Sequence, residues 1–306
     1  MAFREIKTQM DNPELFEIRE EMLEMDVEIL EDNKTATLPL PPFRQSDFDN
    51  NGMLKISTLH SIIDVALVIM LSKNEKFTNR NYLEFHKIAD RRIFFMVCAA
   101  SKIDKKFYSL NLQQPAFAIK STLRHIGKSS TSGIARLICM NTGYVYVERI
   151  TQFAVVDPVS RQPLPVPSWW YNKYIELMKQ EDQPIRMSLL EAPIHAFECE
   201  IKVPSAHMDF NQHTAASAYI SYFIDAACKA ALAGFFSKIK NDFRLYPITA
   251  LDVSYHGESR VDDLLCIRLW ENKDRPFVVH GIMTKNSAQI FQCTTTLSDE
   301  MDKAET

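Results

Sequence analysis

One layout of residues occurs twice along the chain, and this repetition constrains the fold more than any other feature of the sequence. A polar segment leads into a long apolar stretch of helical character, and a set of β-rich runs follows. The apolar stretches contain "IIDVALVIML" in the first copy and "YISYFIDAACKAAL" in the second. Matching Asp64 with Asp225 gives an offset of 161 residues and places Gly52 opposite His213. An internal duplication is the simplest account of this pattern.

Each helical stretch precedes several runs that favour β-strands. The runs after the first helix lie at 91–101, 115–127 and 132–157, and those after the second lie at 247–259 and 263–297. Most of them are linked as hairpins, with polar turns between neighbouring runs. The pattern predicts an α+β fold made twice, in which an antiparallel sheet wraps around one long buried helix.

The segment between the two copies is rich in proline. Six prolines between residues 157 and 193 interrupt any continuous strand or helix there. We therefore predict an N-terminal domain at 1–162, a linker at 163–193 and a C-terminal domain at 194–306. Within the linker, residues 169–179 favour one short amphipathic helix.

Composition excludes several classes of function for this chain of 306 residues. The net charge is −4 and no long run of Lys or Arg occurs, which argues against a nucleic-acid partner. The seven glycines form no GxGxxG, GxxxxGK[ST] or GxSxG motif. None of the six cysteines forms a C-x-x-C pair, so we expect reduced thiols, no metal and no cofactor. The longest apolar run is about half of the roughly 20 residues that a membrane span needs, and the start lacks signal-peptide character, so we expect a cytoplasmic protein.

A polar motif stands at the start of the second helix. In "MDFNQHTAASAYISYFIDAA", Asp209, Asn211 and His213 occupy alternating positions, followed by Tyr219 and Asp225. This stretch resembles the acyl-ACP thioesterases of plants and bacteria, whose pattern is Asp-x-Asn-x-His, then a tyrosine, then an acidic residue.

The resemblance continues beyond the motif and covers nearly the whole chain. The family follows its second helix with a strand ending in Tyr-x-x-Glu, and this sequence has Tyr255 and Glu258 in "VSYHGES". The chain departs from the family where Ala215 and Ala216 replace an Asn-Asn pair and Ser259 replaces a cysteine. The resemblance implies a double hotdog fold, thioester hydrolysis and a catalytic site in the second copy.

The chemistry of thioester hydrolysis gives each polar residue a role. The reaction needs a water, a base for its proton, and donors for the oxygen that becomes negative. We expect Glu258 to be the base, Asn211 to hold the water or the carbonyl, and Asp209 to orient its neighbours. His213 could act as base or as donor, and the sequence leaves both open. A helix beginning near Thr214 would offer unpaired N–H groups to the oxyanion.

Other assignments follow from the resemblance and from the pattern of apolar residues. Thr214, Tyr219 and Tyr255 are the expected substrate-binding residues. His207, His256 and His280 are expected to be solvated. The candidate walls of an acyl-chain pocket, which are equally good core residues, are Ile62, Val65, Ile69, Phe94, Met96 and Val97. The expected substrate is acyl-CoA or acyl-ACP. The two copies would pair within one chain, and two chains could also associate.

Two alternatives to a hydrolase remain open at the level of sequence. Asp209 and Asn211 are also good helix-capping residues, and the first copy has Gly52 in place of the histidine, so the chain could bind acyl thioesters without turnover. A hotdog hydratase or dehydratase has the pattern Asp-x-Asn-x-x-His. That pattern is one residue longer than the spacing from Asp209 to His213, which disfavours this class.

Overall fold

The computed structural model describes residues 20–89, 92–110, 116–179, 181–209 and 212–299. These residues form two compact units. The first unit takes the described residues within Met1–Pro42, Ile62–Ala99 and Gln113–Arg186, and the second takes those within Phe43–Ser61, Ala100–Leu112 and Met187–Thr306. The domain boundaries expected from the sequence remain predictions.

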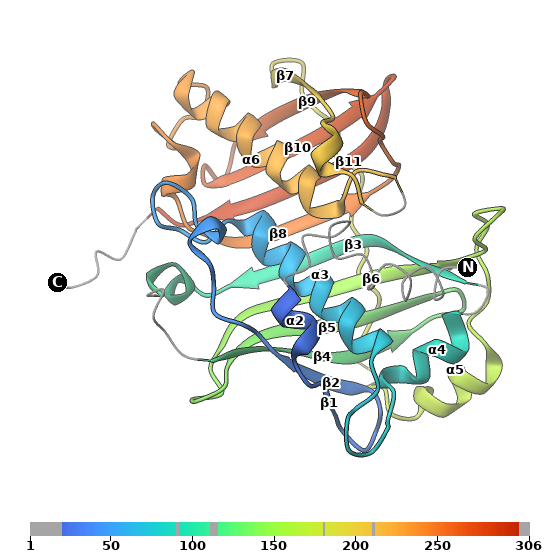
Figure 1. Ribbon diagram of the computed structural model, residues 1–306. Helices are drawn as coiled ribbons and strands as arrows, with labels where there is room; N and C mark the ends of the chain where they lie inside the picture. The colour runs from blue at the N-terminus through green and yellow to red at the C-terminus, as the bar shows by residue number, and fades with distance from the viewer. Residues whose placement is uncertain (1–19, 90–91, 111–115, 180, 210–211, 300–306) are drawn as a thin grey trace. The chain divides into compact units, whose positions relative to one another are not determined.

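The first unit is built on a sheet with the strand order β1-β2-β4-β5-β6-β3. Its strands are β1 (Glu28–Ile29), β2 (Thr35–Pro39), β3 (Ile93–Ile103), β4 (Phe117–Ile126), β5 (Ser130–Cys139) and β6 (Val145–Val156). The pairs from β1 through β6 are antiparallel. The long helix α3 (Ile56–Ser72) lies across this sheet (Figure 1) and buries Ile63, Ala66 and Ile69 completely. The shorter elements are α2 (Glu20–Glu24), η3 (Tyr82–Glu84), α4 (Phe85–Ile88) and α5 (Ser168–Ile175).

The second unit repeats this construction with the strand order β8-β11-β10-β9-β7. Its strands are β7 (Phe197–Lys202), β8 (Ile248–Tyr255), β9 (Leu264–Glu271), β10 (Val278–Lys285) and β11 (Ala288–Leu297). All neighbouring pairs are antiparallel. The long helix α6 (Ala216–Leu232) packs on the sheet, and the short helices are η2 (Gln45–Asp47), η5 (Lys105–Ser109), η6 (Ser205–His207) and η7 (Phe243–Leu245).

The α+β double hotdog predicted from the sequence is therefore confirmed. The expected linker helix is present as α5, although it ends at Ile175. All six cysteines are free thiols. Among the described residues, no helix combines the length and the apolar character that crossing a bilayer requires.

The two copies match at an offset of 160 residues, so the expected offset of 161 is wrong. η2 and η6, α3 and α6, and the isolated bridges Phe48–Leu54 and Met208–Thr214 all differ by 160. The expectation failed because it matched Asp64 with Asp225. Asp64 is the ninth residue of α3 and Asp225 is the tenth residue of α6, so the two acids do not occupy equivalent positions. The counterpart of His213 is therefore Met53, and Gly52 corresponds to Gln212, which shares its positive φ.

Asp64 is the one acidic residue in the apolar stretch of α3, and it is explained by a buried partner. Its carboxylate forms an ion pair with the guanidinium of Arg149 on β6, whose side chain is 0% exposed. Burial raises the pKa of Asp64, although the Arg149 cation opposes the shift. Asp225, the acid paired with Asp64 under the expected offset of 161, is exposed on α6.

Close contact between α6 and β10 depends on Gly281. A Cβ at this position would lie 2.5 Å from Leu269 Cδ2 and 2.7 Å from Phe223 Cε2. We expect Gly281→Ala to lower the free energy of unfolding by about 1–3 kcal/mol, because the helix must move off the sheet. Urea denaturation measures this, with Gly133→Ala as the control, since a Cβ there meets only Thr122 O at 3.5 Å. Equal stabilities of the two variants would contradict the role given to Gly281.

His280 is half-buried and bonded, so its expected solvation is wrong, and so is that of His207, while His256 is exposed as expected. The ring nitrogens of His280 contact Thr294 Oγ1 at 2.9 Å and Asn272 Nδ2 at 3.2 Å. An amide that donates to Nε2 requires the neutral ring. Burial, aided by Arg275, lowers the pKa of His280 below its usual 6.5.

This lowered pKa predicts a loss of stability in mild acid. Below pH 6.5 the unfolded chain takes up the histidine proton first, so the free energy of unfolding falls with pH until the folded pKa is passed. Urea midpoints at neutral and mildly acidic pH should converge in His280→Gln and stay apart in the exposed control His256→Gln. An unchanged pH dependence in His280→Gln would remove this residue as the cause.

Candidate functional site

A tight turn carries the motif residues to the start of α6. Met208 and Thr214 form a bridge, and Asp209 N donates to His213 O at 2.7 Å. The Asp209 carboxylate accepts the His213 N–H at 3.1 Å, so it fixes the turn. Asn211, the expected holder of the water or the carbonyl, lies outside the described residues.

Glu258 comes to this turn from the segment that follows β8. Its Oε2 lies 3.2 Å from His213 Nε2. The side chain of Glu258 is 47% exposed, whereas that of His213 is 10% exposed. The structure therefore brings together two residues that stand 45 positions apart in the sequence, with the carboxylate on the solvent side of the pair.

Ser259 connects the segment that carries Glu258 to the start of α6 through hydrogen bonds. Its buried hydroxyl contacts Thr214 Oγ1 at 2.7 Å and the Tyr219 hydroxyl at 2.8 Å. Its backbone joins the same partners, because Ser259 N donates to the Tyr219 oxygen at 2.9 Å and Ser259 O accepts from Thr214 N at 2.8 Å. The sequence showed Ser259 only as a departure from the family cysteine, and its tie to Thr214 and Tyr219 was missed.

The tyrosines of the motif are packed rather than open to solvent. Tyr219 stacks on Phe291 with ring centroids 5.4 Å apart, and burial raises its pKa, which keeps the hydroxyl neutral. Tyr255 donates from its hydroxyl to Ala216 O at 3.2 Å. Asp225, two helical turns further along α6, is exposed and lies away from this cluster.

α6 begins at Ala216, two residues after the expected Thr214. Its N-cap is Ala215, which has no side chain able to cap the helix. Asp209 therefore serves the preceding turn instead of capping α6. In the first turn of α6, Ala218 N already donates to Ala215 O at 3.0 Å, and the N–H groups of Ala216 and Ser217 remain donors for an anion. No group of three or more His, Cys, Asp or Glu side chains in the described part of the chain is arranged to hold a metal ion.

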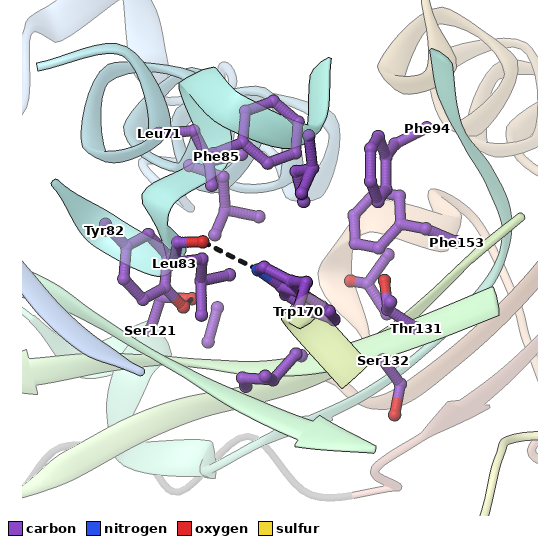
Figure 2. Close-up of a pocket in the computed structure, with 16 residues that line it drawn as sticks. Leu71, Tyr82, Leu83, Phe85, Phe94, Ser121, Thr131, Ser132, Phe153 and Trp170 are labelled. Carbon is purple, nitrogen blue, oxygen red and sulfur yellow. Dashed lines mark hydrogen bonds between the residues drawn. The ribbon is translucent and has the colours of Figure 1, made fainter. Parts of the chain in front are cut away.

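A separate apolar pocket lies in the first unit, between α3 and the sheet (Figure 2). Its empty volume, including the space open to solvent, is about 630 Å³. The walls include Leu71, Tyr82, Phe85, Phe94, Phe153 and Trp170. Of the walls expected from the sequence, only Phe94 lines this pocket, and Ile62, Val65 and Ile69 belong to the core.

Two tandem hotdog units, with a His–Glu pair at the start of the second long helix, define a double hotdog protein of the kind seen in acyl thioesterases. The structure resembles an acyl-ACP thioesterase from Bacteroides thetaiotaomicron with a TM-score of 0.63 at 14% sequence identity, covering 88% of this chain and 100% of that one. It also resembles the 12:0-ACP thioesterase from Umbellularia californica, with a TM-score of 0.62 at 10% identity, covering 86% of this chain and 94% of that one.

A third solved structure gives the same result. It is described as an oleoyl thioesterase from Lactobacillus plantarum, and it matches with a TM-score of 0.64 at 12% identity over 86% of this chain and 95% of that one. No family model matches the sequence, and no curated protein matches it. At these identities the comparisons establish the fold, and they confirm at that level the resemblance to acyl-ACP thioesterases.

Proposed function

We propose that this protein hydrolyses fatty-acyl thioesters, acyl-CoA or acyl-ACP, to a free fatty acid and a thiol, with the catalytic residues in the second unit. The observation that carries the proposal is the contact of 3.2 Å between His213 and Glu258 beside the start of α6. The fold shared with acyl-ACP thioesterases supports the same reaction class.

In this mechanism the Glu258 carboxylate is the general base. Its exposure favours it over His213, because an attacking water can reach it. Glu258 takes a proton from the water as the water oxygen bonds to the thioester carbon. His213 donates an N–H to the carboxylate and holds its orientation, and Asp209 holds the turn that carries His213.

The tetrahedral intermediate needs donors for its negative oxygen. The N–H groups of Ala216 and Ser217 at the start of α6 would supply them, and Asn211 would add its amide. When the carbon–sulfur bond breaks, the proton on Glu258 passes to the departing sulfur. Thr214, Tyr219 and Tyr255 would support substrate binding by fixing the segment after β8 and the first turn of α6, since their hydroxyls bond Ser259 and Ala216.

The apolar pocket of the first unit is suited to bind a fatty-acyl chain. Each CH₂ group buried there would contribute about 0.8 kcal/mol of binding free energy. Aromatic and aliphatic walls such as Phe85, Phe153 and Leu71 suit a hydrocarbon chain.

The test is the release of free thiol from acyl-CoA and acyl-ACP substrates of graded chain length, with the products identified by mass spectrometry. Free fatty acid and thiol in equal amounts are expected. Tight binding without turnover would instead identify an acyl-thioester-binding protein, and a hydrated enoyl-CoA with its thioester intact would identify a hydratase.

A further inference from the structure

The sheet wall of the pocket in the first unit carries hydroxyl groups among apolar side chains. Thr131 on β5 pairs with Phe153 on β6, and Gly133 pairs with Thr151. Because alternate residues of a strand share a face, all four lie on one face of the sheet, and all line the pocket. Figure 2 shows Thr131 beside Phe153 on this wall, whereas the Ser132 hydroxyl points away from it.

The hydroxyl of Thr151 is buried without a partner. Thr151 is 2% exposed, and its Oγ1 has no hydrogen bond among the described residues. Gly133, directly across from it, has no side chain to cover the hydroxyl. Of the other polar groups of the pocket, the Tyr82 hydroxyl contacts Ser121 Oγ at 3.0 Å, whereas Ser132 Oγ, which points away from this wall, is also buried without a partner. Buried polar groups are almost always paired, and a polar group of a ligand in the cavity would give Thr151 the partner that it lacks.

The opposite wall is a strained segment. Leu83 and Glu84 are consecutive non-glycine residues with φ values of 58° and 48°. Trp170 Nε1 donates to Leu83 O at 2.7 Å (Figure 2), and Leu83 N donates to Asn33 O at 2.8 Å. Left-handed backbone of this kind persists where the surroundings fix it, and it is concentrated at ligand sites. The segment presents Tyr82, Leu83 and Phe85 to the cavity.

From these two walls we infer that the pocket selects acyl chains that carry an oxygen substituent, a hydroxyl or a keto group, which hydrogen-bonds to Thr151. The threonine hydroxyl can donate to a keto oxygen or accept from a hydroxyl. Thr131 lies diagonally across from Thr151 on the same face of β5 and β6 and is its neighbour along the wall. The identity of the ligand as an acyl chain rests on the proposed function, but the selection itself requires binding alone.

Binding of free fatty acids tests this without any need for turnover. Palmitic acid is compared with hydroxypalmitic acids whose hydroxyl lies near the carboxyl, in mid-chain or at the methyl end, and with the matching keto acids, by titration calorimetry. At least one oxygenated acid should bind about tenfold more tightly than palmitic acid, the gain expected of one net hydrogen bond. Thr151→Val keeps the shape of the side chain and should abolish this preference.

The control is Thr122→Val, because Thr122 bonds to Thr35 and does not line the pocket. It should keep the preference, and Thr131→Val should reduce it. Equal affinity for all the acids, or an unchanged preference in Thr151→Val, would overturn the inference. Thiol release from palmitoyl-CoA and hydroxypalmitoyl-CoA is measured in parallel. Selective binding without thiol release would support this inference and contradict the proposed hydrolase. Thiol release without selective binding would support the hydrolase and contradict this inference.

Discussion

Replacing Glu258 by Gln is expected to lower the rate of thioester hydrolysis about 10²–10⁴-fold, the usual contribution of a positioned general base. Glutamine keeps the size of the side chain and can still contact His213, but it cannot accept the proton of water. The measurement is kcat/KM for thiol release, with circular dichroism to show that the fold persists. Glu200→Gln, an exposed glutamate on β7, is the matched control and should keep full activity.

Chemical rescue separates the roles of Glu258 and His213. If Glu258 is the base, added formate should restore part of the activity of Glu258→Ala, and imidazole should restore none to His213→Ala. The opposite pattern would make His213 the base and Glu258 its orienting partner. Full activity in both alanine variants would exclude this site altogether.

The largest stability effect is expected at the ion pair of the first unit, in which Arg149 is fully buried and the Asp64 side chain is 29% exposed. Arg149→Met removes a fully buried cation and leaves the Asp64 carboxylate without its counter-charge. Breaking a fully buried pair costs about 3–5 kcal/mol, and the partial exposure of Asp64 sets the expected loss at about 2–3 kcal/mol. Urea unfolding in a Trp270→Phe background reports this change, because Trp169 and Trp170 then supply the fluorescence from the first unit.

The double variant Asp64→Leu/Arg149→Met should recover most of this loss, because two apolar side chains of similar size often replace a buried ion pair without net cost. Lys202→Met is the control, since Lys202 and Asp262 form an exposed pair, 67% and 72% accessible, that should contribute about 0–1 kcal/mol. If Arg149→Met lowers the free energy of unfolding by less than 1 kcal/mol, the ion pair with Arg149 is not what stabilises the Asp64 carboxylate.

Much of the fold could be predicted because it follows local patterns. β-rich runs between polar turns marked β3 to β6 and β8 to β11, and the apolar periodicity marked both long helices. The register of the duplication could not be predicted, because Asp64 and Asp225 have the same side chain but different surroundings. Only the partner of Asp64 on β6 distinguishes them.

The candidate site was predicted in part for a similar reason. Spacing along one segment pointed to Asp209 and His213, and the family pattern pointed to Glu258. The contacts of Ser259 and the residues that line the pocket could not be predicted from the sequence, because they join residues far apart in the chain. Trp170, for example, belongs to the proline-rich segment and reaches Leu83 across 87 positions.

The offset of 160 residues has a consequence for how the two copies diverged. In this register Asp49 corresponds to Asp209 and Asn51 to Asn211, so the first copy retains two of the three motif residues and differs at Met53. Asp49 also still accepts the N–H of Met53, at 3.0 Å, as Asp209 does for His213. At the same offset Leu59 stands where the second copy has Tyr219, so after a gene duplication the two copies would have kept the same turn and diverged in the side chains around it.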